Sequence, residues 1–264
     1  MLAAERRAQI LEQLQRHGAV RVGDLTELLG VSDMTIRRDL DTLAREGLAH
    51  KVYGGATLTR ESATTEPGFD VKWSAQQREK EAIAREAARL VGPGSAVGLS
   101  AGTTTWTLAH ELREIPGLTV VTNSIRVASV LHGGSSGQTV VITGGVRTPS
   151  DALVGPVAVS ALEQLHLDVV FMGVHGMQER AGFSTPNLLE ADLDRMFVRS
   201  ARRLVVVADH TKWGMLGIST IAALADADVV VSDEHLPIEG VEALERAGTD
   251  VVLASVDGAR AWEA

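Results

Sequence analysis

Near the N-terminus, apolar positions recur with the spacing of two short helices joined by a tight turn. Segment 25–29 places its leucines on one helical face, and Gly30 ends this helix because glycine adopts the left-handed conformation of a helix end without strain. Ser32 is a suitable N-cap for a second helix. The apolar face of that helix is expected to hold Ile36, Leu40, Leu43 and Ala44. Its other face is polar, as in a helix-turn-helix whose second helix enters a major groove of DNA.

The flanking pattern extends this pair of helices to a winged helix, which we predict to span residues 1–58. An amphipathic helix over 3–18 and a short strand over 20–22 precede the pair. A hairpin over 47–56 follows it, and we expect this hairpin to form the wing. The candidate DNA-contacting residues are Ser32, Thr35, Arg37, Arg38, Thr42, Arg45, Lys51 and Tyr53.

Charge is distributed unevenly between this unit and the rest of the chain. The whole chain has a net charge of −9 and a pI near 5.4, which argues against indiscriminate binding of polyanions. Residues 1–60, however, hold nine Lys or Arg against eight Asp or Glu, a net +1, so an excess of −10 lies in residues 61–264. A module so weakly charged needs two copies for strong DNA binding, and we therefore expect a homo-oligomer.

Residues 59–74 are predicted to be a linker, either flexible or partly ordered, because they are rich in Thr, Ser and Glu and show neither helical nor strand periodicity. In the second domain, 75–264, helical segments alternate with short Val-rich strands, and the first helix is expected over 75–90. The expected strands are 97–99, 119–121, 139–142, 169–172, 204–208, 229–231 and 251–253. This alternation is typical of an open, mostly parallel α/β sheet with helices on both faces.

Polar and glycine-rich residues cluster after these strands, where open parallel sheets bind ligands. Segment 100–105 combines a glycine, hydroxyl groups and the start of a helix, which suits a phosphate group. A purely structural alternative exists for each position: a tight turn at Gly102, a turn residue at Asn123, a loop histidine at His175. The candidate effector-binding residues are Ser100, Gly102, Thr103, Thr104, Thr105, Asn123, Gly145, Arg147, His175, Asp209 and Lys212.

Two groups of motifs resemble the DeoR family of bacterial transcription regulators. TIRRDL at 35–40 and VYGGA at 52–56 resemble its winged helix. Four further motifs resemble its effector-sensing domain: AGTTT at 101–105, VVTNS at 120–124, LVGPVA at 153–158 and the Asp-x-x-Lys-x-Gly string at 209–214. The resemblance covers residues 5 to 233. It implies a sensor fold related to sugar-phosphate isomerases and a phosphorylated sugar or related metabolite as ligand, with the phosphate held by 102–105 and the pocket lined by Asn123, Asp209 and Lys212.

The chain also departs from the family pattern at four places. Tyr53 stands where the family usually has His, and Ser100 where it often has Asp. Gly-Val-His-Gly at 173–176 replaces the common Gly-Ala-Asp-Gly, and Asp194 stands where a basic residue is usual. The phosphate loop itself is intact. The two changes near the supposed ligand predict altered recognition of its sugar end, not loss of phosphate binding, whereas Tyr53 concerns only a contact made by the wing.

We expect a ligand-responsive transcription regulator, a repressor whose binding to a double-stranded DNA operator is modulated by a phosphorylated small molecule. The alternative is a sugar-phosphate isomerase with an appended winged helix. An isomerase needs a carboxylate placed to move a proton beside a carbonyl, but Gly-Val-His-Gly follows the strand ending at Met172. We therefore predict no catalytic residues and no enzyme activity.

Composition limits the remaining functions. The chain has no cysteine, and its eight histidines include no pair with the sequence spacing of metal ligands, so no metal site and no cofactor are expected. No secretory signal and no apolar run long enough to span a bilayer appear. We expect no membrane partner and a cytoplasmic location.

Overall fold

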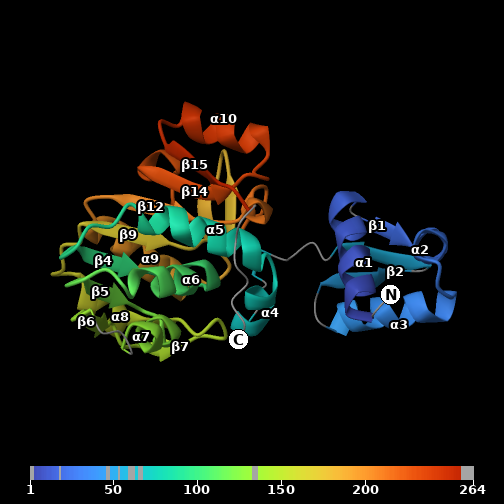
Figure 1. Ribbon diagram of the computed structural model, residues 1–264, viewed down its shortest axis with the longest axis horizontal. Coiled ribbons are helices and arrows are strands. Elements are labelled where there is room, and N and C mark those ends of the chain that lie inside the picture. The colour runs from blue at the N-terminus through green and yellow to red at the C-terminus, as the bar shows by residue number, and fades with distance from the viewer. Residues whose placement is uncertain are drawn as a thin grey trace. The chain divides into compact units, whose positions relative to one another are not determined.

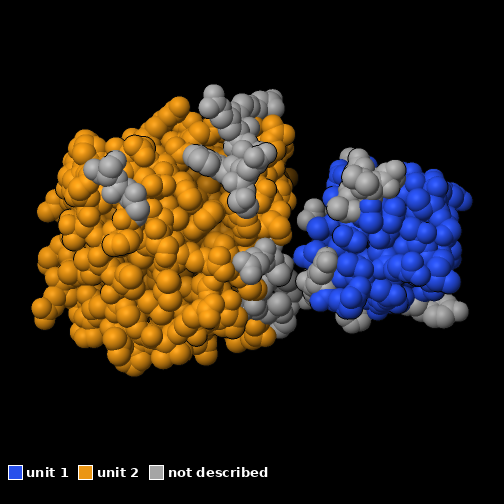
Figure 2. Space-filling model, turned by 60° about the horizontal axis from the view of Figure 1, so that its bottom comes forward, with its two compact units in different colours: residues 1–61 blue, residues 62–264 orange. Residues whose placement is uncertain are grey.

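The computed structural model describes residues 3–17, 19–45, 48–52, 54–58, 63–64, 68–132 and 136–256. The chain divides into two compact units, residues 1–61 and residues 62–264, which Figure 2 colours separately. The division falls inside the segment that we predicted to be a linker. None of the helices in these described ranges is long and apolar enough to cross a membrane.

The first unit is a winged helix. Its elements are α1 (Ala3–His17), β1 (Ala19–Arg21), α2 (Val22–Leu29), α3 (Asp33–Arg45), β2 (Ala49–Val52) and β3 (Gly55–Leu58). The strands form an antiparallel sheet in the order β1-β3-β2. Helix α2 begins before the predicted Leu25, because Val22 is buried and its N–H donates to the Gly54 carbonyl at the wing turn. The predicted strand over 20–22 therefore ends at Arg21.

The turn between α2 and α3 has the predicted chemistry. Gly30 is left-handed, with φ 63°, and its N–H donates to the Thr26 carbonyl. The Ser32 hydroxyl accepts a hydrogen bond from the Thr35 N–H (3.3 Å), which caps α3. The predicted apolar face packs into one core, formed by Ile10, Leu14, Val22, Leu25, Leu29, Ile36, Leu40, Leu43, Ala49 and Ala56. Ala44, predicted on this face, is only half-buried.

The second unit is built on a seven-stranded parallel sheet. Its strands are β4 (Ala96–Leu99), β5 (Thr119–Thr122), β6 (Thr139–Ile142), β9 (Val169–Met172), β12 (Leu204–Val207), β14 (Val229–Asp233) and β15 (Asp250–Ala254). All pairings are parallel, in the order β15-β14-β12-β9-β4-β5-β6. Each strand overlaps one predicted from a Val-rich run, so the predicted α/β class is confirmed.

Helices cover both faces of this sheet (Figure 1). On one face, α5 (Gln77–Ala88), α6 (Thr103–Leu112) and α7 (Ile125–His132) enclose a core that includes Val97 and Phe171. On the other face, α8 (Pro156–Leu162), α9 (Leu188–Ser200) and α10 (Ile238–Arg246) enclose a core that includes Val170 and Val206. Because adjacent strand residues point to opposite faces, both cores are apolar and the strands read as continuous apolar runs.

Several short elements have no clear sequence pattern and were not predicted. They are the hairpin β7 (Val146–Arg147) and β8 (Leu153–Val154), the antiparallel sheet β10 (Gly176–Gln178), β11 (Gly182–Thr185) and β13 (Ser219–Ala222), and the 3₁₀ turns η1 (His210–Lys212) and η2 (Leu224–Asp226). Strands of two to four residues are too short for alternation to distinguish them from loops.

Helix α4 (Phe69–Ser74) lies within the predicted linker, so these residues of the linker are ordered. Phe69 is 6% exposed, and its ring lies 6.0 Å from that of Trp106 on α6. Trp73 lies closer still to Trp106, at 4.5 Å between ring centroids. The segment is mostly polar in composition, but its two aromatic side chains pack against α6 and so attach it to the rest of the second unit.

Candidate DNA interface and effector site

Helix α3 presents Arg38 on its solvent-facing side. The Arg38 side chain is exposed and makes no ion pair within the described part of the chain. Arg37 differs, because its guanidinium pairs with the Asp33 carboxylate one turn earlier on the same helix. An arginine without an intramolecular carboxylate partner is the better candidate for contact with phosphate or a guanine edge.

The other predicted DNA contacts are partly engaged within the unit. The Thr35 hydroxyl lies 2.9 Å from that of Ser32, and the Thr42 hydroxyl accepts a hydrogen bond from Arg45 at 3.0 Å. Lys51 of strand β2 pairs with Asp41 of α3, which fixes the wing against the helix. Tyr53 lies outside the described residues.

Sequence reasoning missed the role of one residue in this helix. Asp39, inside the TIRRDL string, lies on the buried face of α3 and pairs with Arg6 of α1. A buried carboxylate is rare unless it is paired. The helical spacing of Asp39 from Ile36 and Leu43 placed it on the apolar face and was the available signal.

In the second unit, the strand order reverses between β4 and β9, and ligands of open α/β sheets bind beyond the carboxyl ends of the strands at such a point. Ser100 follows β4 and is buried. Its N–H donates to the Phe171 carbonyl, and its hydroxyl accepts a hydrogen bond from the Gly173 N–H, each at 3.1 Å. Ser100 therefore joins the two loops at this point.

Helix α6 starts at this position and its N-terminus has no side-chain cap. The N-cap residue is Gly102, which leaves the first N–H groups of the helix without a side-chain acceptor. The Thr105 hydroxyl donates to the Gly102 carbonyl at 3.1 Å. Among the described residues, no partner accepts from the hydroxyls of Thr103 and Thr104, which are 6% and 7% exposed. This end of α6 therefore offers backbone and hydroxyl donors to an anion.

Asn123 stabilises the loop between β4 and α6 through two side-chain hydrogen bonds. Its side-chain carbonyl accepts a hydrogen bond from the Ala101 N–H at 2.8 Å, and its amide group donates to the Leu153 carbonyl at 3.2 Å. Gly145 belongs to the hairpin that contains Leu153, where an added Cβ would lie 2.5 Å from the Val154 carbonyl oxygen. Both positions thus have a structural reason for their residue type.

The remaining predicted residues occupy different surroundings. Arg147 is two-thirds exposed and pairs with Asp151, whose pKa is lowered by hydrogen bonds from Arg126 and from Arg147 itself. His175 is buried beside β11, and its N–H donates to the Ser184 carbonyl. Arg147 is therefore not brought to the end of α6 by any contact that the structure describes.

Asp209 follows β12, two strands from β4 in the sheet. It is 1% exposed and caps the turn η1 through the Thr211 N–H and hydroxyl. Lys80 of α5, which sequence reasoning missed, is 3% exposed and interacts electrostatically with Asp209. Burial lowers the pKa of Lys80 to about 8, with Asp209 opposing this shift and Lys212 adding to it. The Lys80 ammonium donates to the carbonyls of Lys72 and Ala75.

Two histidines far apart in the sequence meet near Asp209. The rings of His210 and His235 lie 5.4 Å apart between centroids, with Asp233 between them. Sequence spacing, on which the expectation of no metal site was based, does not detect a pair that only the fold brings together, and that expectation stays a prediction. No local signal reveals this pair, because it depends on β12 and β14 becoming neighbours in the sheet.

Among solved structures, ribose 5-phosphate isomerase A from Methanocaldococcus jannaschii is similar over 51% of this chain and 53% of its own, with 18% identity and a TM-score of 0.38. Identity and score are too low to connect the two proteins. The kinship in fold with isomerases therefore stays a prediction.

Sequence comparison gives a clear result. Residues 6–62 match the model of the DeoR-like helix-turn-helix domain, and residues 75–234 match the DeoR C-terminal sensor domain. The HTH-type transcriptional regulator GlpR of Haloferax volcanii is 35% identical over 96% of this chain and 98% of its own. The glycerol-3-phosphate regulon repressor of Escherichia coli K12 is 30% identical over 92% of this chain and 96% of its own. Because both domain models and these full-length relatives agree with the winged helix and the parallel sheet, the chain belongs to the DeoR family of DNA-binding transcription regulators.

Proposed function

We propose that this protein is a repressor whose affinity for its operator is modulated by a phosphorylated sugar or related metabolite, bound at the N-terminus of α6. The uncapped end of α6, with the hydroxyls of Thr103 and Thr104 beside it, is the observation that carries the proposal. Backbone N–H groups and the helix dipole favour an anion at this position, and the hydroxyls add donors for phosphate oxygens. Repression is inferred from relatives that are named repressors.

Two ammonium groups support an anionic ligand at the same edge of the sheet. Burial is the main cause of the lowered pKa of Lys80, and the nearby charge of Lys212 lowers it further, although by less than Asp209 raises it. A phosphate dianion nearby would be attracted to both lysines. In this arrangement Ser100 and Asn123 hold the loops in place while the α6 donors and the lysines contact the ligand.

For DNA binding, we propose that a homo-oligomer places two copies of α3 in successive major grooves, about 34 Å apart or a multiple of that distance. The Arg37–Asp33 and Lys51–Asp41 pairs reduce the free positive charge of each copy. Two linked copies bind DNA more tightly than one copy does, even though neither copy makes additional contacts of its own. An effector alters operator binding only by binding one arrangement of the oligomer more tightly than the other.

The isomerase alternative has less support in the site. Asp209 is 1% exposed, its Oδ1 accepts hydrogen bonds from the N–H and hydroxyl of Thr211, and the loop after β9 reads Gly-Val-His-Gly and supplies no carboxylate. A general base needs a free lone pair within reach of the substrate proton. Turnover assays on ketose and aldose phosphates would contradict our proposal if the purified protein interconverted them.

The direct test selects genomic DNA fragments bound by the purified protein and titrates the best fragment with a panel of sugar phosphates. We expect at least one phosphorylated compound to change operator affinity, and the matching unphosphorylated sugar to have no effect. A reporter fused to the selected promoter gives the sign of regulation. Fragments that bind but respond to no phosphorylated compound would contradict the sensing role while leaving DNA binding intact.

A further inference from the structure

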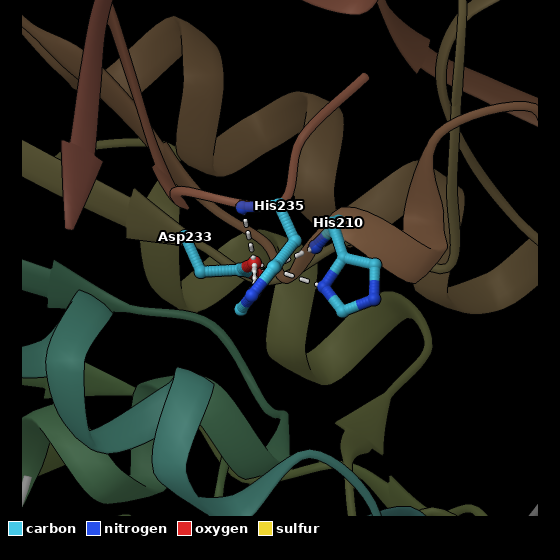
Figure 3. A group of neighbouring side chains, drawn as sticks. All are labelled: His210, Asp233 and His235. Carbon is cyan, nitrogen blue, oxygen red and sulfur yellow. Dashed lines mark hydrogen bonds and ion pairs between the residues drawn. The ribbon is translucent and has the colours of Figure 1, made fainter. Parts of the chain in front are cut away.

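A compact group of three side chains lies at the carboxyl edge of the sheet, outside the proposed phosphate site (Figure 3). Strands β12 and β14 are neighbours and parallel, so the segments that follow them emerge side by side. His210 begins the turn after β12, Asp233 is the last residue of β14, and His235 follows it. The fold thus brings two imidazoles to one carboxylate.

The carboxylate of Asp233 is fixed in orientation. It is fully buried, and its Oδ2 accepts a hydrogen bond from the His210 N–H at 2.8 Å. Its Oδ1 accepts one from the His235 N–H at 3.1 Å. These bonds to backbone donors and to His210 lower the pKa of Asp233 against the effect of burial, so the group is anionic at neutral pH.

Both imidazoles direct Nδ1 toward the same carboxylate oxygen. Nδ1 of His210 lies 2.9 Å from Oδ1, and Nδ1 of His235 lies 3.2 Å from it. In a tetrahedral zinc site, ligands about 2.0–2.1 Å from the ion are separated from one another by about 3.3 Å. The separation of each imidazole nitrogen from the oxygen is therefore already close to that of a zinc site. An ion would take the place of the Nδ1 protons that otherwise make these hydrogen bonds.

The surroundings favour a cation and allow it to enter. The side chains of His210 and His235 are 28% and 55% exposed, so solvent reaches the open side of the group. Besides Asp233, the carboxylates of Asp209 and Glu79 act electrostatically on His210. Two imidazoles and one carboxylate are a donor set that suits zinc-like ions, whereas magnesium and calcium prefer oxygen donors alone.

We propose that His210, Asp233 and His235 bind one divalent transition-metal ion of the zinc class through Nδ1, Oδ1 and Nδ1, with a fourth position open to water. The ion would link the segment after β12 to the segment after β14, and so hold the turn η1. This inference rests on side-chain geometry alone and does not depend on the proposed effector.

The test uses the full-length protein without a polyhistidine tag, stripped of metal by a chelator. Zn²⁺ is titrated by calorimetry, Co²⁺ by its visible absorption, and Mg²⁺ serves as the oxygen-preferring control. We expect one Zn²⁺ or Co²⁺ per chain, a tetrahedral Co²⁺ spectrum, a higher Tm with Zn²⁺ and no effect of Mg²⁺. Absence of stoichiometric Zn²⁺ binding would overturn the proposal.

Matched variants separate this site from adventitious binding by other histidines. His235→Ala removes one ligand at a mostly exposed side chain, so we expect the fold to persist and Zn²⁺ affinity to fall about tenfold or more. His166→Ala removes an exposed histidine outside the group and should leave the affinity unchanged. His210→Ala provides a second ligand variant with the same expectation. An affinity loss below about tenfold in both ligand variants would overturn the assignment.

Discussion

Arg6 of α1 and Asp39 of α3 form an ion pair on the buried side of α3, the helix proposed to enter DNA, and their side chains are only 12% and 6% exposed. The guanidinium donates through Nε to one carboxylate oxygen and through Nη2 to the other. This two-point contact fixes the rotation of α3 about its axis relative to α1. The ion pair, which lies on the buried side of α3, therefore helps to keep Arg38 on the solvent-facing side of the same helix.

Replacing Arg6 with methionine should lower the Tm of the first unit by several degrees. The substitution keeps most of the aliphatic stem but leaves the Asp39 carboxylate buried without its partner, and an unpaired buried charge is strongly destabilising. Thermal unfolding followed by circular dichroism measures the effect. Arg7→Met removes a neighbouring arginine that has no ion pair within the described residues and serves as the control. Equal Tm values for the two variants would mean that the pair adds no stability.

Arg38→Ala should weaken operator binding about tenfold without changing the Tm, because the side chain is exposed, lies outside the core and is proposed to contact DNA. Fluorescence anisotropy at several salt concentrations measures it. A contact to phosphate would also reduce the salt dependence of log K by about 1. Arg89→Ala, at an exposed arginine that caps the C-terminus of α5 and pairs with Glu86, is the control for loss of one positive charge. Unchanged affinity would remove Arg38 from the DNA interface.

Thr103→Val with Thr104→Val should abolish the response to a phosphorylated effector while DNA binding persists. Each substitution keeps the branched shape and removes one hydroxyl donor, and a hydrogen bond to a charged group contributes about 1.5–3 kcal/mol. Calorimetry with the active sugar phosphate measures the loss. Thr107→Val is the matched control on the same helix, because its hydroxyl donates to the Thr103 carbonyl inside the helix. A double variant that keeps full effector affinity would place the ligand elsewhere.

Lys80 should give the protein a distinctive pH dependence. Its pKa is lowered from 10.5 to about 8 in the folded chain, so above pH 8 the unfolded chain binds more protons than the folded one and stability rises with pH. Between pH 8 and pH 9.5, the free energy of unfolding of the wild type should gain about 2 kcal/mol relative to Lys80→Met. Urea unfolding of both proteins at each pH measures this difference, and other titrating groups cancel. Parallel pH profiles would show that the Lys80 pKa is ordinary.

The sequence by itself determined the local elements. Gly30 and Ser32 fixed the turn between α2 and α3, because a left-handed helix end and an N-cap hydroxyl are properties of single residues. The five inner strands of the large sheet were predictable because strands buried on both faces must be apolar throughout. The edge strands β6 and β15 also carry Val-rich runs, although they are only partly buried. The polar residues after those strands followed from the same pattern, since the carboxyl ends of parallel strands share one edge.

Only the tertiary structure decided which polar groups meet. Three interactions join residues on different elements: the Arg6–Asp39 pair, the electrostatic interaction of buried Lys80 with Asp209, and the ring contact of His210 with His235. Hydrophobic periodicity reports which face of an element is buried but not which element covers it. Strand order and helix packing make that choice, so chemistry shared between elements could not be predicted from the chain alone.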